Sequence, residues 1–313
     1  MTLIVRDLRT SDPADTEAFA DVRGRALPFL VSTPEAVLHE ATHAAPEAHV
    51  GRLVAEADGE VIGTAQLGIA HDSPVPGQGY LNVYVHPERV RRGAGSLLVR
   101  AAEERLAAAG ATRLFSWVLD TPDDRAFAER RGYTGSRAAH FLRLDLATGT
   151  LPPLREPPAG VELRTVADFA DDPRPLFALD AETTADEPGD VGAELDDYEQ
   201  WLAGTFRHPL LDHALSTVVV VDGTPAAFTA ARTDGGARYS TGMTGTARAF
   251  RGRGLAKLAK NDSLHRARAA GYAEAFTGND AGNGPMVAIN KWFGYEVCAT
   301  EVRHVRELDR ADR

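Results

Sequence analysis

Arg251-Gly-Arg-Gly-Leu-Ala256 runs directly into an amphipathic segment that ends near Ala270. Two glycines one residue apart allow the backbone to turn tightly and to expose several N–H groups on one side. A helix that begins at this turn adds its unpaired first-turn N–H groups and the positive end of its dipole. The two arginines add full positive charges. The stretch therefore predicts an anion site, and a pyrophosphate group fits that chemistry.

The same loop occurs a second time upstream, which favours a binding loop over the alternative, a plain strand-to-helix turn. Residues 85–98 match residues 246–259 position for position, and the downstream copy is neither a Walker loop nor a complete dinucleotide fingerprint. Further landmarks recur at offsets of 161 to 164 residues: Gly93 and Gly254, Gly110 and Gly271, Gly132 and Gly294, Asp58-Gly59 and Asp222-Gly223. The nearly constant offset indicates that one domain has been duplicated.

A strand, Val-x-Pro, Arg-Gly-x-Gly, a helix, a further strand and a closing Gly-Tyr follow one another in this pattern. The order resembles the GNAT superfamily of acetyl-CoA-dependent N-acetyltransferases, and the tandem arrangement is similar to that of mycothiol synthase and related actinobacterial enzymes. In the family's loop pattern, Gln/Arg-x-x-Gly-x-Gly/Ala, Arg251, Gly254 and Ala256 satisfy every position, whereas Val90 takes the leading place in the first copy. The resemblance implies acetyl-CoA as co-substrate and the second copy as the better coenzyme site.

Length, charge and cysteine content limit the class of protein. A chain of 313 residues suits two ordinary domains, and 43% hydrophobic with 25% charged residues are ordinary globular values. The single cysteine, Cys298, excludes an internal disulfide, and we expect a buried structural thiol. The net charge of -11 argues against nucleic acid as a partner. No apolar run has the length of a signal peptide or membrane span, which predicts a cytoplasmic protein without a membrane partner.

Each copy is predicted to be an α/β domain, a central mixed β-sheet flanked by helices on both faces. The predicted domains are residues 1–148 and 161–313, joined by a proline-rich linker at 149–160. In the first copy we expect strands at 3–8, 52–57, 61–70, 80–85, 113–119 and 141–146, and helices at 14–27, 35–42, 96–109 and 124–131. In the second copy we expect strands at 161–166, 218–221, 226–233, 238–246, 274–277 and 297–307, and helices at 255–270 and 285–293.

The resemblance also implies which residues bind the coenzyme. A GNAT sheet parts after its fourth strand, the thioester arm pairs with the exposed edge, and Gly242 stands where a β-bulge would fit. In the second copy the implied residues are Met243, Thr244, Thr246, Arg251, Gly252, Arg253, Gly254, Leu255, Ala256, Asn279 and Asn283. In the first copy they are Val83, Val85, Arg91, Arg92, Gly93, Ala94, Gly95 and Ser96.

The two asparagines of the second set belong to the run Asn279-x3-Asn283-x-Pro-Met-x3-Asn290, which resembles a segment of the tandem family that borders the coenzyme arm. Helix capping by asparagine and proline explains the same run without a ligand. The first copy has Asp120-Thr-Pro in the corresponding place and none of these asparagines. The run therefore also favours the second copy as the working one.

The residues that would carry acyl transfer depart from the family pattern. A lysine-like amine is only about one part in two thousand neutral at pH 7, so its deprotonation costs roughly 4 to 5 kcal/mol unless the site contributes. Many GNATs use a glutamate on the fourth strand and a tyrosine on the helix before the closing glycine, and here these positions fall at Ser240 and Asn290. We expect a water relay through Ser240 or Tyr239 to serve as base, or a carboxylate from elsewhere in the chain.

An acidic stretch without lysine or arginine runs from Pro175 to Phe206. It lies in the segment that closes over the acceptor in GNATs, so we expect a cationic acceptor to be drawn to it. The predicted acceptor-binding residues are Glu182, Asp186, Glu187 and Asp190. A solvated acidic surface is the alternative interpretation.

The leading hypothesis is an acetyl-CoA-dependent N-acetyltransferase that acts on the amine of a small, cationic metabolite or antibiotic-like molecule. The second copy is catalytic in this hypothesis, and the first is a scaffold or a second coenzyme site. The alternatives are a non-catalytic acyl-CoA-binding regulatory protein and a transferase that modifies a protein N-terminus or lysine. No metal is expected, because His39 and His43 share a helical face without a His-Glu-x-x-His pattern.

Overall fold

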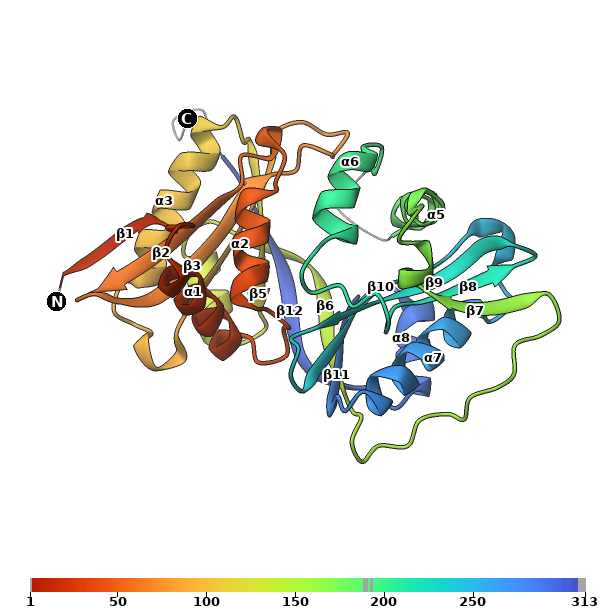
Figure 1. Ribbon diagram of the computed structural model, residues 1–313. Helices are drawn as coiled ribbons and strands as arrows, with labels where there is room; N and C mark the ends of the chain where they lie inside the picture. Colours follow the sequence, from red (N-terminus) through yellow and green to blue (C-terminus); the bar gives the residue numbers. More distant parts are fainter. Residues whose placement is uncertain (1, 188–190, 192–193, 309–313) are drawn as a thin grey trace. The chain divides into compact units, whose positions relative to one another are not determined.

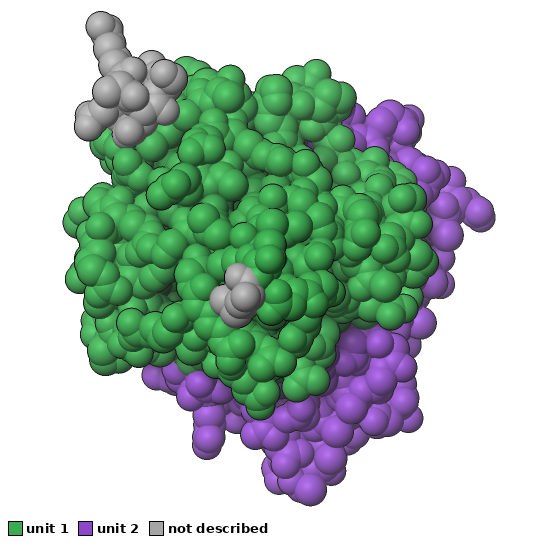
Figure 2. Space-filling view, turned by 90° about the vertical axis from the view of Figure 1, so that its left-hand side faces the viewer, with its two compact units in different colours: residues 1–139, 191–193, 299–313 green, residues 140–190, 194–298 purple. Residues whose placement is uncertain are grey.

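A computed structural model describes residues 2–187, 191 and 194–308. The chain divides into two units, which Figure 2 shows in green and purple. Unit 1 consists of Met1–Ala139, Val191–Ala193 and Ala299–Arg313, and unit 2 of His140–Asp190 and Glu194–Cys298. Each unit has a mixed sheet flanked by helices, so the predicted fold class is confirmed (Figure 1).

Unit 1 has the strand order β1-β2-β3-β4-β5-β12. The pairing of β4 with β5 is parallel, whereas β1 with β2, β2 with β3, β3 with β4 and β5 with β12 pair antiparallel. Its strands are β1 (Leu3–Asp7), β2 (Gly51–Ala57), β3 (Glu60–Ile69), β4 (Gln78–Val85) and β5 (Arg113–Leu119), with parts of β6 (Thr134–Asp145) and β12 (Glu296–Glu307). Its helices are α1 (Pro13–Ala26), α2 (Pro34–Thr42), α3 (Ala94–Ala108) and α4 (Pro122–Glu129).

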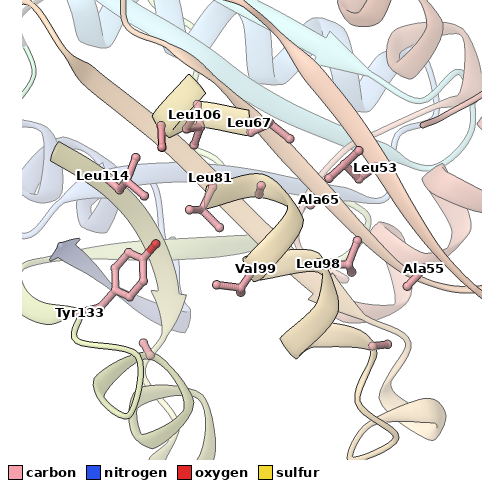
Figure 3. Close-up of a cluster of buried hydrophobic side chains, with 14 of the residues drawn as sticks. Leu53, Ala55, Ala65, Leu67, Leu81, Leu98, Val99, Leu106, Leu114 and Tyr133 are labelled. Carbon is pink, nitrogen blue, oxygen red and sulfur yellow. The ribbon is translucent and has the colours of Figure 1, made fainter. Parts of the chain in front are cut away.

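Alternate side chains of β2 pack in two different layers of unit 1, one on each face of the sheet. Leu53 and Ala55 belong to the core cluster that includes Leu98 and Leu106 of α3, as Figure 3 shows. Val54 points to the other face and packs in the cluster of Phe19 and Val37, from α1 and α2. Alternate residues of a strand face opposite sides, so one strand serves both layers.

Unit 2 repeats this plan with the strand order β6-β11-β10-β9-β8-β7. The pairing of β10 with β11 is parallel, and β7, β8, β9 and β10 pair antiparallel in succession. Its strands are β7 (Val161–Thr165), β8 (Thr217–Val221), β9 (Thr224–Thr233), β10 (Arg238–Thr246) and β11 (Glu274–Asp280), with the rest of β6 and β12. Its helices are α5 (Arg174–Thr184), α6 (Tyr198–Trp201), α7 (Leu255–Ala269) and α8 (Gly284–Trp292), with a π-helical turn at Leu202–Phe206.

The valines of β8 divide between two layers in the same way as the residues of β2. Val218 and Val220 lie in the cluster of Trp201 on one face. Val219 and Val221 lie in the cluster of Leu255, the first residue of α7, on the other. All four valines are at most 4% exposed, which fits a strand that is covered on both faces.

The last strand of each copy completes the sheet of the other copy's unit. Residues 301–307 of β12 pair antiparallel with all of β5 in unit 1, and the Ser136 hydroxyl donates to the Arg303 carbonyl on the next strand. In unit 2, Arg143 of β6 donates to Glu274 of β11 at 2.6 Å. This arrangement differs from the predicted domains, 1–148 and 161–313, in which residues 141–146 and 297–307 closed their own sheets.

Two further features differ from the sequence-based expectations. The acidic stretch contains helices α5 and α6, which we did not predict, because its acidic residues obscure the apolar stripe of Leu176, Leu179 and Trp201. Cys298 is exposed, so the predicted buried thiol was wrong. It lies on β12 in a run of exposed residues, where alternation does not reveal which positions are covered.

Residues 151–158, within the proline-rich linker, form neither helix nor strand. Side chains of unit 2 contact two of their backbone carbonyl groups. The amide of Asn261 donates to the Pro153 carbonyl at 3.1 Å, and His265 Nε2 lies 2.8 Å from the Pro152 carbonyl. Both side chains come from α7.

No helix in the described ranges is long and apolar enough to cross a membrane. The cytoplasmic location stays a prediction.

We predict that a fragment of residues 1–148 does not fold stably, because β5 loses the seven residues of β12 that pair with it. In hydrogen–deuterium exchange, peptides covering 113–119 should be protected in the full chain and exchange rapidly in the fragment. A chain that ends after Leu308 keeps β12 and is the matched control. A fragment that unfolds cooperatively with full protection of β5 would contradict the exchange of strands.

Candidate functional site

A cavity of about 570 Å³ lies in unit 2, over the downstream glycine loop. The end of β10, the loop, the first turn of α7, the end of β11 and the start of α8 line it, together with the end of the α5 segment. The predicted coenzyme residues among its lining are Met243, Thr244, Thr246, Arg251, Gly252, Gly254, Leu255, Ala256, Asn279 and Asn283. Arg253 is not part of the lining and lies over the Phe250 ring. We call this cavity the unit 2 groove.

The two central parallel strands of unit 2 part at the groove. The pairing of β10 with β11 ends at Thr241 and Thr277, and the residues that follow on both strands line the cavity. A register shift between Thr241 and Met243 shows that the predicted bulge at Gly242 is present. Beyond this point β10 still pairs with β9 on its other edge. Its edge toward the groove can therefore pair with an extended ligand, and a backbone N–H there can polarise a carbonyl group.

The glycine loop has the conformation that an anion site requires. Gly252 and Gly254 both have φ of +77°, in the left-handed region, and a Cβ added at either would meet nothing within 4 Å. The loop therefore leaves open space above its backbone and leads into the 15-residue helix α7. An oxyanion of a pyrophosphate can approach the first-turn N–H groups there. The unit 2 groove thus fits the phosphate part of a coenzyme.

Asp186 pairs with the arginines of this loop. Its carboxylate lies 2.7 Å from Arg248 and 2.5 Å from Arg251. Hydrogen bonds from the two guanidinium groups lower the pKa of Asp186 to about 2. Lys257, which sequence reasoning missed, lines the groove three residues after Gly254 and lies 4.8 Å from the Trp292 ring centre. Its place in the first helical turn was the signal that could have found it.

The other predicted acceptor-binding residues have different environments. The Glu182 carboxylate accepts a hydrogen bond from the backbone N–H of Arg248 at 2.6 Å, which holds the segment that leads into the same loop. Glu187 lines the groove, and desolvation raises the pKa of its carboxyl group, with a contribution from Asp180. Asp180 itself is buried and accepts the indole N–H of Trp201 at 2.7 Å. Asp190 lies outside the described residues.

The three residues proposed for catalysis do not line the groove. Tyr239 is fully buried with its hydroxyl 2.8 Å from the Ser263 hydroxyl, and burial raises the pKa of its phenol. Ser240 lies on the opposite face of β10 from its neighbour Thr241, which does line the groove. Asn290 is fully buried and reaches the groove through Asn279, whose side-chain oxygen it contacts.

Unit 1 has its own cavity, of about 620 Å³, over the upstream loop. All eight residues predicted for the first copy line it: Val83, Val85, Arg91, Arg92, Gly93, Ala94, Gly95 and Ser96. Arg91 has φ of +62° and Gly93 of +91°, so this loop repeats the left-handed positions of Gly252 and Gly254. The repeated backbone geometry supports the duplication. An arginine in this conformation carries strain that a glycine avoids.

The α4 segment engages the loop of unit 1. Arg91 pairs with Asp123 at 2.8 Å, and Arg131 donates to the Ser96 hydroxyl at 2.6 Å. A Cβ at Gly95 would lie 3.2 Å from the Phe127 ring. Part of the loop's hydrogen-bonding capacity is therefore used within unit 1.

The exchanged strand β12 adds a carboxylate to unit 1 that the sequence repeat assigned to the second copy. Glu301 pairs with Leu119, a residue that lines the unit 1 cavity. Burial raises the pKa of Glu301 to about 7. Burial also raises the pKa of Tyr84, which lines the cavity, to about 12, and the charge of Glu301 adds to this rise. No cluster of three His, Cys, Asp or Glu side chains suited to a metal occurs among the described residues.

Comparisons with known proteins place these features in a family. Residues 17–133 match the Acetyltransferase (GNAT) family. Three proteins called mycothiol acetyltransferase are similar to this chain. That of Frankia casuarinae is 39% identical over 146 residues, 46% of this chain and 41% of that protein. That of Kineococcus radiotolerans is 38% identical over 165 residues, 52% of each chain. That of a Parafrankia species is 30% identical over 277 residues, 82% of this chain and 83% of that protein.

The first two of these matches therefore span about half the length of the relative or less. Two solved structures resemble the whole chain. A GCN5-related N-acetyltransferase from Sphaerobacter thermophilus has a TM-score of 0.70 at 21% identity, over 97% of this chain and 95% of its own. A tandem GNAT protein from the clavulanic acid biosynthesis pathway has a TM-score of 0.72 at 22% identity, over 98% of both chains. At this identity the likeness concerns the fold.

We predict that Asp186→Asn tightens binding of CoA to the unit 2 groove. The change frees Arg248 and Arg251 to interact with an anion, and exposed pairs of this kind contribute about 0.2 to 1 kcal/mol, so the gain should be at most about fivefold. Calorimetric titration with CoA at low and high salt measures it, and the gain should shrink as salt rises.

Asp21→Asn breaks the exposed Asp21–Arg25 pair on α1 and is the matched control. Weaker CoA binding by Asp186→Asn would mean that Asp186 instead holds Arg251 in the position that binds the anion.

Proposed function

Because the chain belongs to the GNAT acetyltransferase family, we propose that it is an acetyl-CoA-dependent N-acetyltransferase whose productive site is the unit 2 groove. The observation that carries this proposal is the convergence of three features on one cavity. These are the parted edge of β10, the left-handed glycine loop and the N-terminus of α7. The first suits a thioester arm and the other two suit a pyrophosphate.

The backbone of β10 would stabilise the reacting thioester. In the proposed reaction, the amine nitrogen forms a bond to the acetyl carbon, the C–S bond breaks, and the CoA sulfur leaves as a thiolate that takes up a proton. A backbone N–H at Met243 or Thr244 would hold the oxyanion of the tetrahedral intermediate. Such a donor leaves no side-chain signature, so the bulge at Gly242 is the local feature that supports it.

We assign the general base to Glu187. It is a carboxylate on the groove lining, and its pKa is raised from the usual range by desolvation. A carboxylate with a raised pKa is a better proton acceptor for an ammonium group than an ordinary one. Tyr239 and Ser240 lie behind the groove and would need a water to reach an amine, so they remain the second choice.

The acceptor is proposed to be a small amine that is cationic at neutral pH. Glu187 faces the groove, and residues of the surrounding stretch between Pro175 and Phe206 add negative charge. Asp186 and Glu182 already bind Arg248, so the attraction rests less on them than the sequence suggested. Because the relatives are called mycothiol acetyltransferase, their acceptor belongs among the amines tested.

A panel of amine metabolites with acetyl-CoA tests the function directly. We expect release of free CoA with at least one small cationic amine, and a product heavier by one acetyl group in mass spectrometry. Lysine peptides and protein N-termini complete the panel. Tight binding of acetyl-CoA without turnover on any amine would instead support a non-catalytic acyl-CoA-binding protein.

We predict that Gly254→Asp abolishes productive coenzyme binding, whereas Gly93→Asp reduces activity much less. An aspartate at position 254 adds strain at a positive φ and places a carboxylate where the pyrophosphate must approach. Steady-state kinetics and CoA titration measure both variants. Gly235→Asp controls for strain, because Gly235 has φ of +69° and open space around it but does not line the groove.

Equal losses in the two loop variants, or a loss confined to Gly93→Asp, would move the productive site to unit 1. Glu301 and Tyr84 would then be its candidate base and acid.

We predict that Glu187→Gln lowers kcat by about 100- to 10,000-fold, the usual range for a general base. In the unaltered enzyme, kcat/KM should fall as pH drops through the raised pKa of Glu187, because only the carboxylate accepts a proton. This acidic limb should disappear in the variant. Glu199→Gln, an exposed residue of the same acidic stretch, is the control. An unchanged acidic limb would assign the base to another group.

A further inference from the structure

Lys260 is a buried cation to which the proposed reaction gives no role. It lies on α7, the helix that begins at the glycine loop, and is 0% exposed. Its Nζ donates to Asn290 Oδ1 at 2.5 Å and lies 4.8 Å from the Tyr295 ring centre. Burial lowers the pKa of its ammonium group to about 7. No carboxylate among residues 2–187, 191 and 194–308 forms an ion pair with Lys260. Such a buried ammonium group is unfavourable, and a methionine would fill similar space without that penalty.

The lysine starts a chain of side-chain amides that ends in the groove. Asn290 accepts from Lys260 with its oxygen and donates with its Nδ2 to the Asn279 oxygen. Asn279, on β11, lines the groove just beyond the point where β10 and β11 part. Three side chains from α7, α8 and β11 thus connect the interior of unit 2 with the place proposed for the thioester.

The direction of this chain follows from the chemistry of lysine. In its protonated form the lysine donates and cannot accept, and the Asn290 oxygen faces it in the 2.5 Å contact. The Asn290 NH₂ group must then face Asn279 and find its oxygen there. This leaves the NH₂ group of Asn279 as the part of that amide available to a ligand in the groove. Without the lysine, either amide can turn over, because amide oxygen and nitrogen have nearly the same shape.

We infer that Lys260 is a positioning residue that fixes the orientation of Asn290 and Asn279, so that Asn279 presents N–H donors to the acyl carbonyl oxygen in the unit 2 groove. The inference rests on the proposed acetyl transfer at this groove and adds a side-chain donor to the backbone N–H of β10. A donor set of two is the usual arrangement for an oxyanion site.

A purely structural role makes a different prediction for Asn290→Asp. The aspartate keeps an acceptor for Lys260 and adds an opposite charge, so a lysine that needs only a partner should be satisfied. The same change removes the N–H that Asn290 donates to Asn279. The positioning role therefore predicts a loss of function in a variant in which the lysine remains paired.

The experiment measures the carbonyl stretch of bound acetyl-CoA by isotope-edited infrared spectroscopy, with the thioester carbon labelled with ¹³C. The full chain, Lys260→Met, Asn290→Asp and the control Lys291→Met are compared, and kcat is measured for each. Lys291 is exposed on α8, one residue from Asn290, and does not line the groove. Far-ultraviolet circular dichroism and melting temperatures establish that each variant is folded.

In the unaltered chain and in Lys291→Met, binding should shift the carbonyl stretch to lower wavenumber. In Lys260→Met and Asn290→Asp the shift should be smaller, and kcat should fall about tenfold or more, the effect of one misdirected hydrogen bond. A stretch and kcat unchanged in Lys260→Met would overturn the inference. So would normal values in Asn290→Asp if Lys260→Met fails to fold.

The outcome is separable from that of the proposed function. A Lys260-dependent carbonyl shift in a protein that acetylates no amine would support the positioning role and contradict the transferase. Normal turnover, with the same shift of the carbonyl stretch in Lys260→Met as in the unaltered chain, would support the transferase and overturn the positioning role.

Discussion

The end of backbone pairing between β10 and β11 is the constraint on which the site depends. Two parallel strands that part leave a row of backbone groups that water or a ligand must satisfy. The bulge between Thr241 and Met243 starts this parting, and the glycine loop turns the chain directly afterwards into α7. The exposed edge, the anion site and the helix N-terminus therefore follow one another along a single connection. In the proposed complex the exposed edge binds the thioester arm of acetyl-CoA, and the anion site and the helix N-terminus together bind its pyrophosphate.

The same backbone geometry occurs in both loops with different side-chain partners. Both units place left-handed residues at equivalent positions, Arg91 and Gly93 in one, Gly252 and Gly254 in the other. In unit 1, Asp123 and Arg131 bind parts of the loop. In unit 2, Asp186 binds the loop arginines while the backbone above the glycines stays open. The difference between the copies lies in the side chains around the loop.

Local features of the fold could be predicted from sequence, because they depend on residues close together in the chain. The glycine loop, the helix after it, the bulge at Gly242 and most strand limits are of this kind. The sheet that the last strand of each copy joins could not be predicted. β6 and β12 are related by the repeat, and the alternation of their apolar and polar residues fits either sheet. Helix α5 was hidden by its acidic residues, although Leu176 and Leu179 are buried.

The candidate site shows the same division between local and distant information. The residues of the loop and of β10 come from one continuous segment, and nearly all of them line the groove. The pairing of Asp186 with Arg251 joins residues 65 positions apart, and the contact of Lys260 with Asn290 joins residues 30 positions apart. Such contacts depend on how α5, α7 and α8 pack on the sheet. Periodicity in one sequence does not contain that information.

Hydrogen–deuterium exchange with increasing acetyl-CoA reports on the backbone N–H groups of both units in one experiment. If the productive site lies in unit 2, peptides covering 243–246 and 251–256 gain protection at lower acetyl-CoA concentrations than those covering 83–85 and 91–96. Protection confined to the upstream segments, or no change in 243–246 at saturating acetyl-CoA, would contradict the assignment of the thioester arm to the parted edge of β10.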